Sequence, residues 1–192
     1  LMVLQSTASY IDLLELKKII DSTSMNQLFS FPVDKISEFK LGEIQSDYNA
    51  FAKAFQDEKL FTRLRPYAPE NIATDKNISQ YIGRRAMLKQ QKDLELAKYD
   101  LIKKNYQRSQ QLFSQNVIST IELENERIKF LQAQQSLENI NISLSQTEEG
   151  ISNLNKTKSG SAINAEKDKI NFASQTLQLF EQLRKSLKQW EQ

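Results

Sequence analysis

The residues best suited to specific contacts in this 192-residue chain are an arginine, a leucine and a serine in one short stretch. Leu112 follows Arg108 by four positions, and Ser119 follows Leu112 by seven. A guanidinium presents five donors in a fixed fork that suits carboxylates and exposed carbonyls, while leucine adds apolar contact and serine a small hydroxyl. Such a set is suited to binding another protein rather than to catalysis.

The usual catalytic and metal-binding residue types are missing. The chain contains no His and no Cys, which excludes zinc sites built from them, Cys nucleophiles and His-based acid–base catalysis. It also lacks a Gly-rich phosphate loop and a serine nucleophile elbow. Acidic pairs such as Glu148 and Glu149 lie in helical patterns that imply no cleft between them. We therefore expect no enzymatic activity, no cofactor and no metal.

The charge of the chain is nearly balanced. The formal net charge of +2 is too small to attract nucleic acid or anionic lipid through bulk charge. The densest basic pairs are at 84–85 and 103–104, and acidic residues alternate between them. This pattern is typical of a solvated helix face.

The composition favours long helices, because only 4 Gly and 3 Pro are available to form turns. Upstream of the contact stretch, a seven-residue repeat runs through Met87, Leu94 and Leu101. Downstream, a second one runs through Leu123, Phe130, Leu137, Leu144 and Ile151. Two such seams joined by a short polar turn predict an all-α fold with an elongated antiparallel coiled-coil helical hairpin.

The remaining pattern predicts helices packed at the base of this hairpin. A first amphipathic helix is expected from about residue 10 to 20, a loop over 23–40, and a second helix over 43–64 that ends at Pro66 and Pro69. A third helix is expected over 77–115. The apolar face of the second helix is predicted to comprise Ile44, Tyr48, Phe51, Phe55 and Leu60.

The fourth helix is expected to begin at Ser119, where Glu122 completes a capping-box pattern. It would continue to Trp190, because its length of roughly 107 Å matches the roughly 100 Å offered by the two upstream helices and their linker. Ser159-Gly160 is its weak point. Beyond it the seam is expected to change phase. The later seam would comprise Ile163, Ile170, Leu177, Ala173, Phe180 and Leu187.

Two groups of side chains have both a packing and a binding interpretation. The first group is Arg108, Leu112 and Ser119. In the packing interpretation Leu112 faces the seam, Arg108 lies over it and Ser119 only caps a helix. On chemistry alone this packing interpretation is favoured. Tyr99, Tyr106 and Phe113 form another seven-residue row. This row either broadens the hairpin core or contacts a neighbouring hairpin, and the sequence leaves both open.

The turn and its flanks resemble the periplasmic adaptor subunits, or membrane fusion proteins, of the HlyD type. The spacing Arg-x3-Leu-x6-Ser in that family matches Arg108, Leu112 and Ser119. Because of this match, we prefer the binding interpretation of these three residues over the packing interpretation. The chain departs from many relatives at Asn116, where they carry Gly, although Asn also tolerates a left-handed turn conformation. Both ends of the chain are similar to the borders of a lipoyl-like domain.

The resemblance implies a location and partners. Such an adaptor is anchored in the inner membrane by an N-terminal helix that lies outside this chain, and its hairpin projects through the periplasm. The tip would bind a TolC-like outer-membrane channel, and other parts would engage an inner-membrane ABC transporter in the export of peptides or proteins. The tip contacts implied are Arg108, Leu112, Ser119, Gln115, Asn116 and Val117. The adaptors would form a ring, commonly of six copies, whereas this fragment is expected to be monomeric or weakly associated.

Four segments follow from this interpretation. Residues 1–8 would be the end of a lipoyl-like half, and 9–75 the basal helices and linker. Residues 76–160 would be the distal hairpin with its tip at 114–120, and 161–192 the returning helix of the basal part. Two alternatives stay open: an adaptor of a drug-efflux pump, and a coiled-coil scaffold without a transport role.

Overall fold

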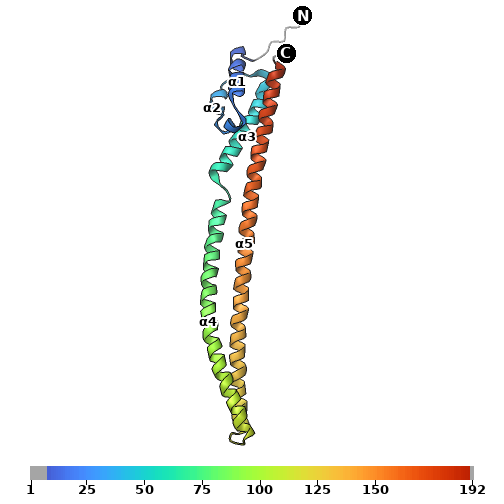
Figure 1. Ribbon diagram of the computed structural model, residues 1–192. Coiled ribbons are helices and arrows are strands. Elements are labelled where there is room, and N and C mark those ends of the chain that lie inside the picture. The colour runs from blue at the N-terminus through green and yellow to red at the C-terminus, as the bar shows by residue number, and fades with distance from the viewer. Residues whose placement is uncertain (1–7, 191–192) are drawn as a thin grey trace. The chain divides into compact units, whose positions relative to one another are not determined.

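The computed structural model describes residues 8–190, apart from the side chains of residues 25–27, and this part of the chain is helical without any strand (Figure 1). The all-α class expected from the sequence is confirmed. Residues 1–7 of the expected lipoyl-like fragment and the last two residues of the expected segment 161–192 lie outside the described residues.

The chain divides into two compact units, which are described separately. Unit 1 comprises the residues up to Ala68 together with those from Ala162, and unit 2 comprises Pro69–Ser161. The helix α5, Thr120–Trp190, contributes to both units. None of the described helices is both long enough and apolar enough to cross a membrane.

Unit 1 has a conventional hydrophobic core. Its elements are α1 (Tyr10–Ser22), η1 (Met25–Ser30), α2 (Val33–Ile36), η2 (Gly42–Ile44), α3 (Gln45–Leu64) and the last part of α5. At the centre of this core, Phe51 of α3 meets Phe31 at 5.0 Å and Phe180 of α5 at 5.4 Å between ring centroids. The helices are thereby joined by aromatic contacts, each of which adds to the free energy of plain burial.

The sequence predicted the helices of unit 1 better than its connections. Four of the five residues assigned to the face of α3 are buried, whereas Leu60 is partly exposed. The expected loop over 23–40 is wrong in part, because it contains η1 and α2, and α2 buries Val33 and Ile36. Short helical turns of this kind carry no long periodicity, so a search for repeating patterns misses them.

Unit 2 consists of most of α4 (Ala68–Ser114) and the first part of α5, which are joined by the short connection 115–119 (Figure 1). The rings of Tyr99 and Tyr106 contact Phe130 at 5.5 and 5.4 Å. Further from the turn, Lys158 forms a 2.5 Å ion pair with Asp75. The expected start of this helix at residue 77 is wrong: α4 begins nine residues earlier and contains Pro69 in its first turn, where a missing N–H costs nothing.

The face that α4 turns toward α5 differs from the one expected. Met87, Leu94 and Leu101 are 68%, 68% and 63% exposed, so they do not form the seam. From residue 74 onward, the residues of α4 that are buried or half-buried are instead Thr74, Ile78, Arg85, Leu88, Lys92, Glu95, Tyr99, Ile102, Tyr106, Ser109 and Leu112. This row has the same seven-residue period, but its charged members lower its mean hydropathy, so the sequence pattern points to the apolar row through Met87, Leu94 and Leu101 instead.

The α5 helix is unbroken through Ser159 and Gly160, as expected. Its predicted seam through Leu123, Phe130, Leu137, Leu144 and Ile151 is half-buried throughout. Beyond the glycine the prediction is mixed. Phe180 and Leu187 are buried as predicted, but Ile163, Ile170, Leu177 and Ala173 are exposed. Of these four, Ile163, Ile170 and Leu177 recur every seven residues along one exposed side of α5.

Candidate functional site

The connection between α4 and α5 is short, and hydrogen bonds between its own backbone groups hold its conformation. Asn116 has a φ of 58°, in the left-handed region, and lies two residues after the end of α4. The amide of Val117 donates to the carbonyl of Leu112 at 2.9 Å, and the amide of Asn116 donates to that of Phe113 at 2.9 Å. This is the Schellman pattern, which satisfies the last carbonyls of a helix. Asn at this position therefore does what a glycine would do, as expected.

The start of α5 is capped by reciprocal hydrogen bonds between Ser119 and Glu122. The Ser119 hydroxyl accepts from the Glu122 amide at 3.3 Å, and the Ser119 amide donates to the Glu122 carboxylate at 2.8 Å. The expected capping box is thereby confirmed. The donation from the Ser119 backbone amide, together with that from its hydroxyl at 2.9 Å, lowers the pKa of the Glu122 carboxyl below its usual value.

The three residues of the matched spacing fall at this connection but differ in exposure. Arg108 is exposed, and its guanidinium forms no hydrogen bond or ion pair with any described residue. Leu112 lies one helical turn further along and is half-buried. Ser119 is exposed, with its hydroxyl already engaged in the cap. Arg108 is therefore the group most available to a partner.

The other residues predicted for the tip are all exposed. They are Gln115, Asn116 and Val117. A further exposed residue, which was not predicted from the sequence, is Ile121 in the first turn of α5. Its side chain is 70% exposed. Two exposed aliphatic side chains thus lie four positions apart at the turn. The sequence does contain a signal for Ile121. It lies two residues before the seam residue Leu123, and helical geometry therefore points its side chain away from α4.

The aromatic row of α4 is used mainly inside unit 2. Tyr99 and Tyr106 both contact the Phe130 ring. The Tyr99 ring is tilted by 34° relative to it, whereas the Tyr106 ring is nearly parallel to it, at 13°. Phe113, the third member of the row, is partly exposed close to the turn. The arrangement favours the packing interpretation for the two tyrosines.

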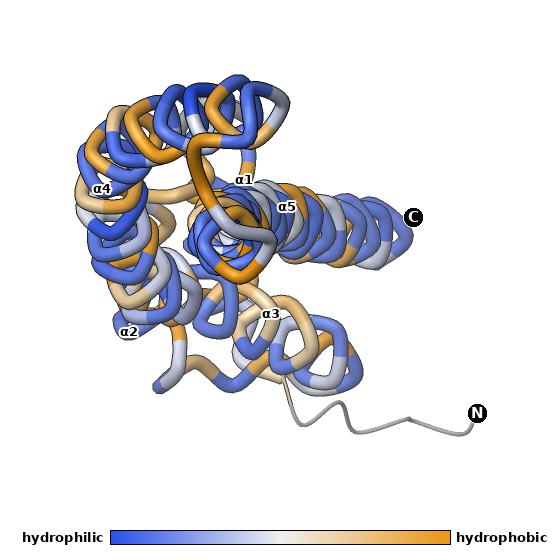
Figure 2. The backbone as a smooth tube through the Cα atoms, turned by 90° about the horizontal axis from the view of Figure 1, so that it is seen from below, coloured by the Kyte–Doolittle hydropathy of each residue, from blue (hydrophilic) through white to orange (hydrophobic). Residues whose placement is uncertain are grey.

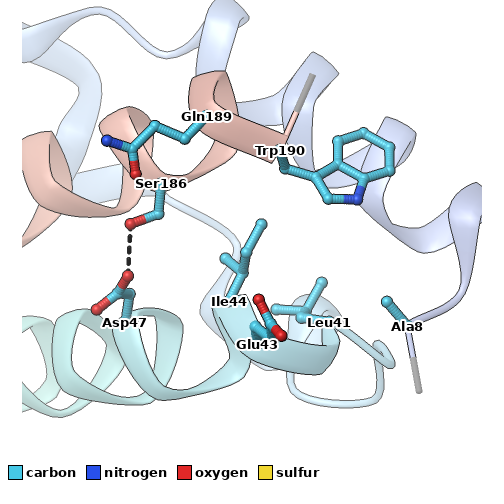
Figure 3. Close-up of a pocket in the computed structure, with 8 residues that line it drawn as sticks. All are labelled: Ala8, Leu41, Glu43, Ile44, Asp47, Ser186, Gln189 and Trp190. Atoms are coloured by element: carbon cyan, nitrogen blue, oxygen red, sulfur yellow. Dashed lines mark hydrogen bonds between the residues drawn. The ribbon is translucent and has the colours of Figure 1, made fainter. Parts of the chain in front are cut away.

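Unit 1 contains a pocket at its α3–α5 contact that sequence reasoning did not find (Figure 3). The Asp47 carboxylate lies in it and accepts from the Ser186 hydroxyl at 2.5 Å and from the Gln182 amide at 3.0 Å. Asp47 is therefore committed to joining α3 to α5. Trp190 borders the same pocket, and its ring centroid lies 5.8 Å from that of Tyr10, with the two rings tilted by 48°. Nothing in this set activates a nucleophile or moves a proton.

Across residues 8–190, no group of three or more acidic side chains gathers in a way that could hold a metal ion. Comparison with known proteins adds no further guide, because no family model matches the chain and no curated protein matches it either.

Proposed function

We propose that the chain is the hairpin portion of a non-catalytic periplasmic adaptor, which links an inner-membrane ABC exporter to a TolC-like outer-membrane channel for export of peptides or proteins. In this proposal unit 2 is an antiparallel coiled-coil hairpin, with the α4–α5 connection as its tip. The basal helices lie in unit 1, and several copies form a ring in the full-length protein.

One observation carries the proposal. The Arg-x3-Leu-x6-Ser spacing falls on the connection between two long helices, with Arg108 and Ser119 exposed. An unrelated coiled coil could contain the same three residues anywhere along its length. Their position at the turn is what the resemblance to HlyD-type adaptors requires, and it supports a role in docking.

In this proposal, each exposed side chain at the connection makes a different kind of contact with the channel. The Arg108 guanidinium has no internal partner among the described residues, so all its donors are available to carboxylates or helix-end carbonyls on a channel rim. Val117 and Ile121 supply exposed apolar contact. Ser119 holds the start of α5 and presents a small surface that a bulky side chain would obstruct.

The test uses the full-length protein in its own cell, with the chromosomal gene deleted and variants supplied in its place. The readout is the set of peptides whose amount in the medium falls on deletion, measured by mass spectrometry. Arg108→Ala is expected to abolish their export while leaving the helical content unchanged. Arg127→Ala, which removes another exposed arginine on α5, is the matched control and should export normally.

Ser119 needs two substitutions, because it also caps a helix. Ser119→Asn keeps a capping side chain and should retain most export, whereas Ser119→Arg introduces bulk and charge and should abolish it. Normal export by both Arg108→Ala and Ser119→Arg would refute the docking role. A deletion that changes drug susceptibility and not peptide export would favour a drug-efflux adaptor, and a deletion without effect on either would favour a scaffold.

A further inference from the structure

The pocket at the α3–α5 contact of unit 1 has features that suit a positively charged ligand (Figure 3). Its volume of about 340 Å³ falls in the range of roughly 300–1,000 Å³ that is typical of small-ligand sites. Glu43 of η2 and Asp47 of α3 line one side, and Ser186 and Trp190 of α5 line the other. Every lining residue belongs to unit 1, so the site is built within one compact unit.

The pocket carries two negative charges that nothing described offsets. Glu43 and Asp47 lie four positions apart, and no Lys or Arg is among the described residues that line the pocket. Neither carboxylate forms an ion pair with any residue of the described part of the chain. Like charges about one helical turn apart repel each other. A cation bound between them would remove this repulsion and be attracted by both.

The two carboxylates keep the capacity to accept further hydrogen bonds. Each oxygen of Asp47 accepts one, from the Ser186 hydroxyl at 2.5 Å and from the Gln182 amide at 3.0 Å. A carboxylate has about four lone-pair positions, so about two remain for a ligand. Asp47 does not serve as a helix cap, because no side chain caps the start of α3. Glu43 forms no hydrogen bond with any described residue, so its carboxylate is fully available.

Trp190 adds an aromatic wall to this acidic pocket. Toward its C-terminal end α5 is mostly hydrophilic, so a large aromatic side chain there is unusual (Figure 2). Trp190 is 37% exposed, and Leu41 and Ile44, both buried, line the pocket with it. The face of an indole attracts ammonium and guanidinium groups. Carboxylates beside an aromatic ring and apolar side chains match a cation carried on an apolar stem.

We propose that this pocket binds an organic cation in which an ammonium or guanidinium group is carried on a short apolar chain. The cationic group lies between Glu43 and Asp47, and the chain packs against Trp190 and Ile44. A basic side chain of a peptide and a free alkylamine share this chemistry. A metal ion fits less well, because two carboxylates supply few of the about six oxygen ligands that Ca²⁺ takes.

The chain has a single tryptophan, so binding at the pocket can be observed directly. The first probe is N-acetyl-lysine amide, and its Nε-acetylated form is the control, because acetylation removes the charge and keeps the stem. In NMR spectra of the 192-residue chain, the charged probe should shift the indole N–H signal of Trp190 with a dissociation constant in the millimolar range. The acetylated form should leave that signal in place.

Substitutions test the assigned contacts. Glu43→Gln removes one charge without breaking a described hydrogen bond, and should weaken binding of the charged probe about 10-fold. Glu38→Gln is the matched control, because it removes an exposed glutamate of unit 1 that does not line the pocket, and it should bind normally. Trp190→Leu keeps apolar contact without the ring, and should weaken binding as measured by saturation transfer to the probe. Circular dichroism checks that all three variants remain helical.

Two further probes separate the sources of the cation. Tighter binding of the tripeptide amide acetyl-Ala-Lys-Ala would assign the pocket to basic side chains, whereas equal or tighter binding of butylammonium would assign it to free amines. An indole signal that stays unchanged up to about 50 mM probe would overturn the proposal. So would an equal response to the acetylated control, or unweakened binding by Glu43→Gln. Arg108→Ala should bind the probe normally, so failure of the proposed docking role leaves this result unaffected.

Discussion

At the scale of single residues, the start of α5 depends on the reciprocal bonds between Ser119 and Glu122. Because the pKa of the Glu122 carboxyl is lowered in the folded chain, its stabilising effect is complete above the usual value near 4.5 and is lost as the pH falls through the lowered value. We expect carboxyl NMR to show Glu122 titrating below the usual value of a glutamate. Ser119→Ala should return its pKa toward the usual value and lower helix stability by about 1 kcal/mol.

Tyr48 has the opposite dependence on pH. Its hydroxyl donates to the Val33 carbonyl at 2.7 Å, and burial, with a smaller effect from Asp34, raises its pKa to about 12. The stabilisation is therefore complete below about pH 10 and falls as the pH rises toward 12. In chemical unfolding, the wild-type chain should lose roughly 2 kcal/mol more than Tyr48→Phe over this interval. Equal losses in both proteins would contradict the assigned role.

At the scale of elements, α4 approaches α5 closely where the Tyr81 ring lies against Gly150. A Cβ at Gly150 would overlap the Tyr81 ring, whereas Gly83 and Gly160 have no neighbour within 4 Å of that position. Gly83→Ala and Gly160→Ala should each raise stability by up to about 1 kcal/mol through helix propensity. Gly150→Ala should lower it, and Tyr81→Ala in the same chain should remove the penalty. Thermal unfolding of the set measures all three effects.

The elements also show what the sequence can and cannot reveal. The long helices, the capping box at Ser119 and the left-handed Asn116 follow from local chemistry, and each is confirmed. The inner face of α4 was missed because its half-buried row contains Arg85, Lys92 and Glu95, whose charges are read as solvated. Helix pairing is decided by contacts such as Tyr106 with Phe130, which come from another part of the chain. Periodicity finds the rows but does not choose between them.

At the scale of the whole molecule, stability is unevenly distributed. Unit 1 contains the hydrophobic cluster around Phe51, whereas unit 2 buries few side chains completely. We expect calorimetry to resolve two unfolding transitions. Tyr48→Phe should shift only the one that belongs to unit 1, and Gly150→Ala only the other. A single transition that both substitutions move equally would show that the continuous α5 couples the units fully.

The shared seven-residue period of the inner seam and the exposed apolar rows has a consequence for how such a chain can change in length. Inserting one residue into α4 or α5 would rotate everything beyond it by about 100° and exchange one face for another. Only a whole heptad, added to both helices at once, preserves every face. Relatives of this protein should therefore differ in the length of these helices by whole heptads, that is, in discrete steps of about 10 Å, with intermediate lengths excluded.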